Sequence, residues 1–313
     1  MTDYLQRALE LADATRGRAH PRPDVGAVLV RGGMIVGEGS TEAGGRHGEI
    51  VALAAAGDAA RASTLYVTME PCAHQGSTPP CTEAIVAAGV AKVVVGSRDP
   101  NPEAAGGAER LRVAGVAVEL ADSFAARAQT EAWRTWITRG RPFVTWKVAV
   151  TLDGRVAVPG SRWVSGEESR RRVHELRARS DAVAVGMGTV RADNPRLDVR
   201  GVEAARQPRR LAFGRGPLPE GSELELRTGP IAEELRQLAG EGVQSLLLEG
   251  GPTLAAAFLA EDLVDKLLVF VAPTLAGAGP RMLGDLPAAI ALTRLTSEPI
   301  GEDVLLGAYV HEP

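Results

Sequence analysis

The chain has 313 residues, a length that favours two domains over one. Hydrophobic residues make up 45% and charged residues 24%, as in ordinary soluble globular proteins, and the formal net charge is −4. A nucleic-acid-binding protein would usually carry a basic excess, no apolar run is long enough to span a membrane, and two cysteines are too few for a disulfide scaffold. The polar N-terminus does not resemble a secretory signal. We therefore expect a soluble, cytoplasmic protein of the enzyme type, with no nucleic-acid or membrane partner.

The first half alternates helical and strand-like segments. Apolar residues recur at helical spacing over residues 3–16, and two strand-like runs flank Arg31-Gly32-Gly33 as in a hairpin. The expected strands are 25–30, 34–39, 64–68 and 91–96, and the further helices are 49–56, 82–88, 109–114 and 122–138. This alternation indicates a layered α/β domain. The Gly/Pro break at residues 139–142 ends it, so we place the domains at 1–141 and 142–313.

The second half also predicts an α/β domain. Strands are expected at 143–150, 181–185, 244–248, 266–271 and 304–310, and helices at 167–179 and 253–259. The segment between Gly188 and Gln244 is expected to be rich in loops. No internal repeat or low-complexity tail is present.

One histidine and the only two cysteines have the composition of a zinc site. His47 lies at the start of an expected helix, and Cys72 and Cys81 each follow a proline. Three such protein ligands leave the fourth tetrahedral position to water, which distinguishes a catalytic zinc site from a structural one. Cys81 also starts an expected helix, and helix N-termini lower thiol pKa values, which favours the thiolate that zinc requires. Bound zinc lowers the pKa of its water towards about 7.

Glu49 follows His47 by two residues and is expected to carry protons rather than to bind the metal. The order His-x-Glu followed by Pro-Cys and a second Cys is the zinc deaminase signature, in which the glutamate is the general acid and base. Two simpler interpretations remain open. The cysteines could be small buried hydrophobic residues, or His74 could be a fourth ligand that closes a structural zinc site.

Several motifs in sequence order resemble the bifunctional riboflavin-biosynthesis deaminase/reductase family of the RibD type. Eight residues separate the cysteines, whereas cytidine and nucleic-acid deaminases usually have two between theirs. The matching motifs are His47-x-Glu49, PCAHQGSTPPC (71–81), DPNP (99–102), WKVAVTLDGRVA (146–157), SRW (161–163), VGMGTVRADNPRL (185–197) and LEGGPTLAAAFL (248–259). The resemblance therefore covers essentially the whole chain.

The resemblance implies a cytidine-deaminase-like three-layer α/β/α domain followed by a dihydrofolate-reductase-like α/β domain. The family deaminates 2,5-diamino-6-(5-phosphoribosylamino)pyrimidin-4(3H)-one with zinc and then reduces the ribosyl side chain to ribityl with NADPH. It implies His47, Cys72 and Cys81 as zinc ligands and Glu49 as proton donor. The implied NADPH positions are Ala149, Trp163, Thr189, Asp193, Gly251, Pro252, Thr253, Leu254, Ala255, Ala256 and Ala257, and the implied substrate positions are Ser161, Arg177, Leu197, Arg200 and Glu249. A homo-oligomer, dimer or tetramer, is expected.

Residues of the second half permit both functional and structural interpretations. The turn 249–252 before a helix could bind a phosphate or could be an ordinary connection. Arg191 stands where a standard dinucleotide fingerprint has its third glycine, so that fingerprint is absent. Arg177 and Arg200 suit a phosphorylated substrate, or lie on a solvated face. Lys147 lies in an apolar strand and needs either a ligand or an acidic partner such as Asp153.

The sequence departs from the family pattern at three places. Arg22 stands where members commonly have asparagine, and Ser77 where many have a basic residue, so Arg22 is a candidate to supply the missing charge. Between Gln207 and Glu249 the chain is shorter by tens of residues, and Phe213-Gly214 replaces a common acidic residue. An alternative to the bifunctional enzyme is therefore a deaminase whose second half serves only as a scaffold.

Overall fold

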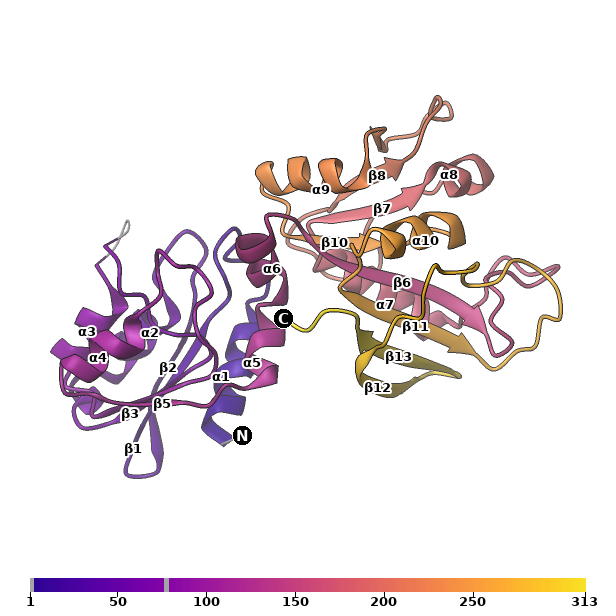
Figure 1. Ribbon diagram of the computed structural model, residues 1–313. Coiled ribbons are helices and arrows are strands. Elements are labelled where there is room, and N and C mark those ends of the chain that lie inside the picture. Colours follow the sequence, from indigo (N-terminus) through magenta and orange to yellow (C-terminus); the bar gives the residue numbers. More distant parts are fainter. Residues whose placement is uncertain (1–2, 76–78) are drawn as a thin grey trace. The chain divides into compact units, whose positions relative to one another are not determined.

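The computed structural model describes residues 3–75 and 79–313, so Ser77 lies outside the described residues (Figure 1). The chain divides into two compact units, which we describe separately. Unit 1 contains the residues up to Arg139 together with Pro313, and unit 2 contains residues 140–312. Over the described ranges, none of the helices has both the length and the apolar character that a membrane crossing requires.

Unit 1 is built on a five-stranded sheet in the order β2-β1-β3-β4-β5. β1 is antiparallel to β2 and β3, whereas β3, β4 and β5 run parallel. The strands are β1 (Gly26–Arg31), β2 (Met34–Ser40), β3 (Thr64–Val67), β4 (Lys92–Val95) and β5 (Ala117–Leu120). The helices are α1 (Asp3–Ala14), α2 (Gly48–Ala56), the short 3₁₀ helix η1 (Gly57–Ala60), α3 (Cys81–Ala87), α4 (Gly107–Val113), α5 (Phe124–Gln129) and α6 (Glu131–Arg139).

Alternating side chains of β1 pack on opposite faces of this sheet, as the twofold repeat of a strand requires. Ala27 and Leu29 join a buried cluster with residues of α2, α3 and α4, whereas Val28 and Val30 pack with Ala8 of α1. Helices therefore cover both faces, with α2, α3 and α4 on one side and α1 and α5 on the other (Figure 1). The expected three-layer α/β/α domain is confirmed.

Unit 2 contains an eight-stranded sheet in the order β12-β13-β11-β6-β10-β7-β8-β9. The strands from β11 to β9 in this order are parallel, and β13 and β12 add an antiparallel edge. The strands are β6 (Phe143–Thr151), β7 (Ala182–Gly186), β8 (Arg209–Phe213), β9 (Glu225–Arg227), β10 (Ser245–Leu248), β11 (Lys266–Ala272), β12 (Thr293–Ile300) and β13 (Asp303–Tyr309). The helices are α7 (Glu167–Ala178), α8 (Met187–Asp193), α9 (Ile231–Gly240) and α10 (Pro252–Ala260).

Helices cover both faces of this second sheet as well. Leu235 and Leu238 of α9 and Phe258 of α10 pack with alternate residues of β6, β7 and β10 in one buried cluster. Val173 of α7 packs with Phe270 on the opposite face. The carboxyl ends of β6, β7 and β10 consequently meet at one edge, where the first residues of α8 and α10 follow.

One expectation about the elements was wrong, and several elements were missed. The single helix expected over 122–138 is two helices, because Thr130 leaves the helical region with φ −111° and ψ 21° and its carbonyl starts the next turn at Arg134. The segment 188–244 is rich in loops, as expected, but it also contains β8, β9 and α9, which were not expected. Four strands were missed in all, β5, β8, β9 and β12, and seven of the eight residues of β12 are exposed.

Candidate active sites

The first candidate site lies where α2 and α3 begin. His47 is the N-cap residue of α2, and Cys81 is the first residue of α3. A Cβ atom at Gly48 would lie 2.4 Å from the Val25 carbonyl oxygen, so glycine lets the start of α2 approach the residue before β1 closely. Glu49, Cys72 and Cys81 are all buried, with at most 8% of each residue exposed.

The three expected zinc ligands converge. His47 Nδ1 lies 3.2 Å from Cys81 Sγ and 3.7 Å from Cys72 Sγ, and the three ligand atoms all lie within 4.8 Å of one another. One imidazole nitrogen and two sulfurs at this separation suit tetrahedral zinc, whose bonds to such ligands are about 2.0 to 2.3 Å long. Among the residues that the structure describes, this cluster does not include His74, which is exposed. The geometry therefore favours a three-ligand site over the closed structural one.

The sequence predicted a stabilised thiolate at Cys81, whereas the structure places the stabilising hydrogen bonds at Cys72. A hydrogen bond from the Cys81 thiol, together with one from His47, lowers the pKa of Cys72 to about 4. The backbone N–H of Cys81, at the start of α3, also donates to Cys72 Sγ at 3.3 Å. The pKa of Cys81 is raised, first by its hydrogen bond to Cys72 and then by burial. The helix terminus thus stabilises the thiolate of Cys72 rather than that of Cys81.

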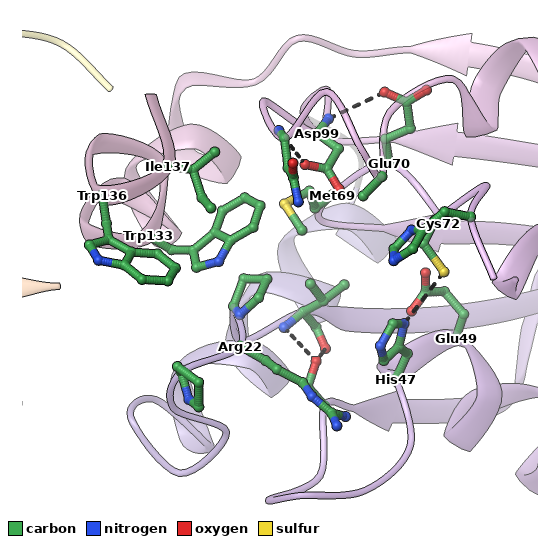
Figure 2. Close-up of a pocket in the computed structure, with 17 residues that line it drawn as sticks. Arg22, His47, Glu49, Met69, Glu70, Cys72, Asp99, Trp133, Trp136 and Ile137 are labelled. Atoms are coloured by element: carbon green, nitrogen blue, oxygen red, sulfur yellow. Dashed lines mark hydrogen bonds between the residues drawn. The ribbon is translucent and has the colours of Figure 1, made fainter. Parts of the chain in front are cut away.

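Glu49 lies beside the ligands with its carboxyl group turned towards them (Figure 2). Burial raises the pKa of Glu49 to about 7, and the charge of His47 acts in the opposite direction. A carboxyl group with a pKa near neutrality can both accept and return a proton under physiological conditions. This is the arrangement that a general acid and base beside a metal requires.

A cavity of about 320 Å³ opens onto His47, Glu49 and Cys72. Trp133, Trp136 and Ile137 of α6 line it opposite the ligands (Figure 2). These residues were not predicted from the sequence, although two tryptophans three residues apart on an amphipathic helix indicate an apolar wall. Its remaining described lining residues are Pro21, Arg22, Pro23, Val25, Thr41, Met69, Glu70, His74, Asp99, Asn101 and Ala104. The cavity is large enough for a small planar ligand.

The second candidate site is a buried cluster of charges in unit 2. Arg177 of α7 forms a two-pronged ion pair with Glu249, with nitrogen–oxygen distances of 2.6 and 3.0 Å. Lys147 Nζ lies 3.7 Å from the same carboxylate, so Glu249, and not Asp153, is its acidic partner. Burial acts to raise the pKa of Glu249, but Lys147 and Arg177 outweigh it and hold the pKa below its usual value. Burial lowers the pKa of Lys147.

Two of the other substrate positions implied by the resemblance, Leu197 and Arg200, lie on a segment that contacts this cluster, and Ser161 lies on a different loop. Arg177 Nη1 donates to the Asp198 carbonyl oxygen at 3.1 Å, which brings the segment 197–200 to the ion pair. Leu197 is buried and has a φ of +54°, and Arg200 pairs with the Asp198 carboxylate at 3.3 Å. Ser161 lies on the loop after β6, where its hydroxyl donates to the Trp163 carbonyl oxygen.

The positions implied for NADPH lie mostly at the carboxyl edge of the sheet. Ala149 is on β6, Thr189 and Asp193 are on α8, and the run 251–257 forms the N-cap and first turns of α10. A Cβ atom at Gly251 would lie 3.7 Å from Thr189 Oγ1, so these two elements adjoin. Ala255 is fully buried in the core, which leaves only its backbone for a ligand. Trp163 is 53% exposed and contacts the guanidinium groups of Arg162 and Arg170.

Comparisons with known proteins match both units to families. Residues 1–97 match the cytidine and deoxycytidylate deaminase zinc-binding region, and residues 142–306 match the RibD C-terminal domain. The first match covers all three expected zinc ligands. The second spans the segment 207–249 that departs from the family pattern.

Full-length relatives and solved structures agree with these matches. The riboflavin biosynthesis protein RibD of Aquifex aeolicus is 38% identical, with 97% of each chain covered, and that of Mycobacterium tuberculosis is 41% identical, with 96% of this chain and 94% of the relative covered. The crystal structure of Acinetobacter baumannii RibD superposes with a TM-score of 0.86 at 35% identity, covering 98% of this chain and 97% of the other. A deaminase/reductase structure from Thermotoga maritima gives the same TM-score at 33% identity and the same coverage. The chain belongs to the riboflavin biosynthesis protein RibD family.

Proposed function

We propose that the chain catalyses two consecutive steps of riboflavin biosynthesis. Residues 1–141 hydrolytically deaminate 2,5-diamino-6-(5-phosphoribosylamino)pyrimidin-4(3H)-one, and residues 142–313 reduce the ribosyl side chain of the product to ribityl with NADPH. The observation that carries the proposal is the convergence of His47, Cys72 and Cys81 beside Glu49 at a cavity, in a chain that matches RibD relatives from end to end. Nothing in the folds or the matches favours a deaminase with an inactive second half.

In the deaminase site, zinc bound by His47, Cys72 and Cys81 would supply an activated water and a Lewis acid. Glu49 accepts a proton and returns protons to a ring nitrogen and to the departing amine. Water thereby replaces the amino group on the ring carbon, and ammonia leaves. Burial of Glu49 serves this role because it brings the pKa of the carboxyl group near 7.

In the reductase site, NADPH supplies a hydride when bound. We assign its binding to Ala149, Trp163, Thr189, Asp193 and residues 251–257. Gly250 and Gly251 form the short connection between β10 and α10, where a Cβ atom at Gly250 would lie 2.9 Å from Leu254 Cδ2. The backbone N–H groups at the start of α10 lack helical partners and fit the phosphates of a dinucleotide.

We assign the phosphorylated pyrimidine in this second site to Ser161, Arg177, Leu197, Arg200 and Glu249. The ion pair between Arg177 and Glu249 holds both side chains in fixed positions before any ligand arrives. Such a fixed pair offers a carboxylate acceptor and guanidinium donors to a polar substrate.

We further infer a homo-oligomer, dimer or tetramer, in the cytoplasm. Leu152 and Leu275 are 67% and 73% exposed and adjoin through a hydrogen bond from Leu152 N to the Thr274 carbonyl oxygen, which gives unit 2 an apolar patch suited to a second copy. Metal-binding thiols require a reducing compartment, which supports the cytoplasm. Sedimentation of the wild type and of Leu275→Ser tests the oligomer, because a monomeric wild type would refute it.

Product masses test the two activities together. The purified protein is incubated with the diaminopyrimidinone phosphate, with and without NADPH. Deamination raises the mass by about 1 Da, since an amino group becomes a carbonyl, and reduction adds about 2 Da more. If the product formed with NADPH shows only the increase of about 1 Da, the protein has the deaminase activity alone. If the mass does not change, both proposed activities are refuted.

A further inference from the structure

The deaminase cavity has an uneven distribution of charge. Three carboxyl groups line it, those of Glu49, Glu70 and Asp99, whereas Arg22 is the only arginine or lysine among its described lining residues. The substrate in the proposed function carries a phosphate dianion. Carboxylates repel such a group, so it needs a cation that holds it away from them.

Arg22 lies close to the segment that carries His47. Its backbone N–H donates to the Ala19 carbonyl oxygen at 3.0 Å, which fixes the turn before β1. Its Nη1 atom donates to the Gly45 carbonyl oxygen at 2.6 Å, two residues before the zinc ligand. The side chain therefore extends along one side of the cavity towards the metal-binding end (Figure 2).

The guanidinium group of Arg22 has no carboxylate partner among the described residues. Other arginines of unit 1 do, such as Arg46, which pairs with Glu42 at 2.9 Å, and Arg7, which pairs with Glu38 at 2.8 Å. Within the described chain, the guanidinium group of Arg22 donates a hydrogen bond to one acceptor, the backbone carbonyl oxygen of Gly45. A guanidinium group has five N–H donors. A half-buried arginine with donors to spare and no counter-charge is suited to an anionic ligand.

We propose that Arg22 anchors the 5-phosphate of the substrate in the deaminase cavity. With the pyrimidine ring at His47 and Glu49, the phosphoribosyl group extends along the cavity, and the free edge of the guanidinium binds two phosphate oxygens. The bond to Gly45 holds the guanidinium in place for this contact. Arg22 then determines specificity for phosphorylated over dephosphorylated pyrimidines, an inference that rests on the proposed deaminase function.

A purely structural role makes a different prediction. If Arg22 only held the Gly45 carbonyl and thereby positioned His47, its loss would lower zinc content and impair all substrates equally. An anchor instead affects the phosphorylated substrate alone, and it affects KM rather than kcat.

The test compares the zinc-loaded wild type with Arg22→Gln and Arg22→Lys on the diaminopyrimidinone in its phosphorylated and dephosphorylated forms. Arg22→Gln should raise KM for the phosphorylated form about 10- to 100-fold, as expected for the loss of hydrogen bonds to a charged group, and leave the dephosphorylated form unchanged. Arg22→Lys should restore part of the difference, since it keeps the charge but not the paired donors. The matched control is Arg46→Gln, because Arg46 is the neighbour of Gly45 in the chain, has its own carboxylate partner and is outside the cavity lining.

An equal rise in KM for both forms, an unchanged KM, or loss of zinc in Arg22→Gln would overturn the proposal. A second measurement covers the case in which the wild type deaminates neither form and the proposed function fails. Ribose 5-phosphate is titrated calorimetrically into the wild type and into Arg22→Gln. The two proteins are compared because any binding site for it in unit 2 is present in both. Loss of one binding event in the variant supports the anchor, and identical binding in both proteins overturns it.

Discussion

Replacing Glu49 by glutamine separates the proposed proton transfer from metal binding. Glu49 is only 3% exposed and lies beside the ligands without being one of them, so an amide of the same size should leave the fold and zinc content intact. A positioned general acid and base contributes about 10²- to 10⁴-fold to a rate, equivalent to about 3 to 5 kcal/mol of the barrier. We predict that Glu49→Gln loses this factor in ammonia release and keeps the wild-type rate of NADPH oxidation on deaminated intermediate.

Glu83→Gln is the matched control for this substitution. Glu83 lies on α3, the helix that begins at Cys81, but it is exposed and pairs with Arg110 at 2.8 Å. Exposed pairs contribute at most about 1 kcal/mol, so ammonia release should stay within a few-fold of the wild type. If Glu49→Gln kept more than about a tenth of the wild-type rate with a full complement of zinc, the assignment of Glu49 as proton carrier would be refuted.

Three further changes test other parts of the structure. Cys72→Ser should abolish zinc binding and deamination, measured by metal analysis and ammonia release, and spare NADPH-dependent reduction; bound zinc in this variant would contradict the ligand assignment. Glu249→Gln leaves Lys147 and Arg177 facing a neutral amide in a buried site. This variant should not oxidise NADPH, should deaminate normally, and should lose about 3 kcal/mol of stability in urea unfolding. Normal reduction by the variant would contradict the assignment of this site. Burial raises the pKa of Asp99 from 3.8 to about 6, so the folded state binds a proton on this carboxyl group more tightly than the unfolded chain does. The free energy of unfolding should therefore fall by at most about 3 kcal/mol as the pH rises from about 4 to 6. Asp99→Asn should make the slope in urea unfolding across this range shallower, with the part due to Glu49 remaining, and an unchanged slope would refute the prediction.

Local sequence signals were sufficient where a short segment encodes both the structure and the chemistry. The hairpin of β1 and β2 follows from two alternating runs around Gly32-Gly33, both of which have positive φ. The zinc site follows from residue types in a fixed order, since His47 and Cys81 lie at helix starts and Cys72 and Cys81 each follow a proline. These features depend little on the rest of the chain.

Long-range packing explains what the sequence did not reveal. β12 pairs with β13 through backbone hydrogen bonds while its side chains stay exposed, so it has no buried face that a hydrophobic pattern could mark. α9 has Leu235 and Leu238 on one buried face, but this helical pattern is short and is flanked by glycine-rich loop segments, which indicate loop. The partner of Lys147 was likewise hidden, because Glu249 lies about a hundred residues away on a neighbouring strand end.

Which cysteine sulfur the start of α3 stabilises also needed the three-dimensional structure. Helix position alone predicted a stabilised thiolate at Cys81, but the amide at the start of α3 donates to the sulfur of Cys72. Sequence shows which residue begins a helix, whereas only the fold shows which sulfur the terminal N–H groups face.

X-ray absorption at the zinc edge of the zinc-loaded protein tests the account most directly, because the chemistry depends on three protein ligands and one exchangeable position. The predicted first shell contains two sulfur atoms at about 2.3 Å, one imidazole nitrogen and one oxygen from water. A second imidazole in the shell, as His74 would provide, or a shell without sulfur, would contradict a hydrolytic site built by His47, Cys72 and Cys81.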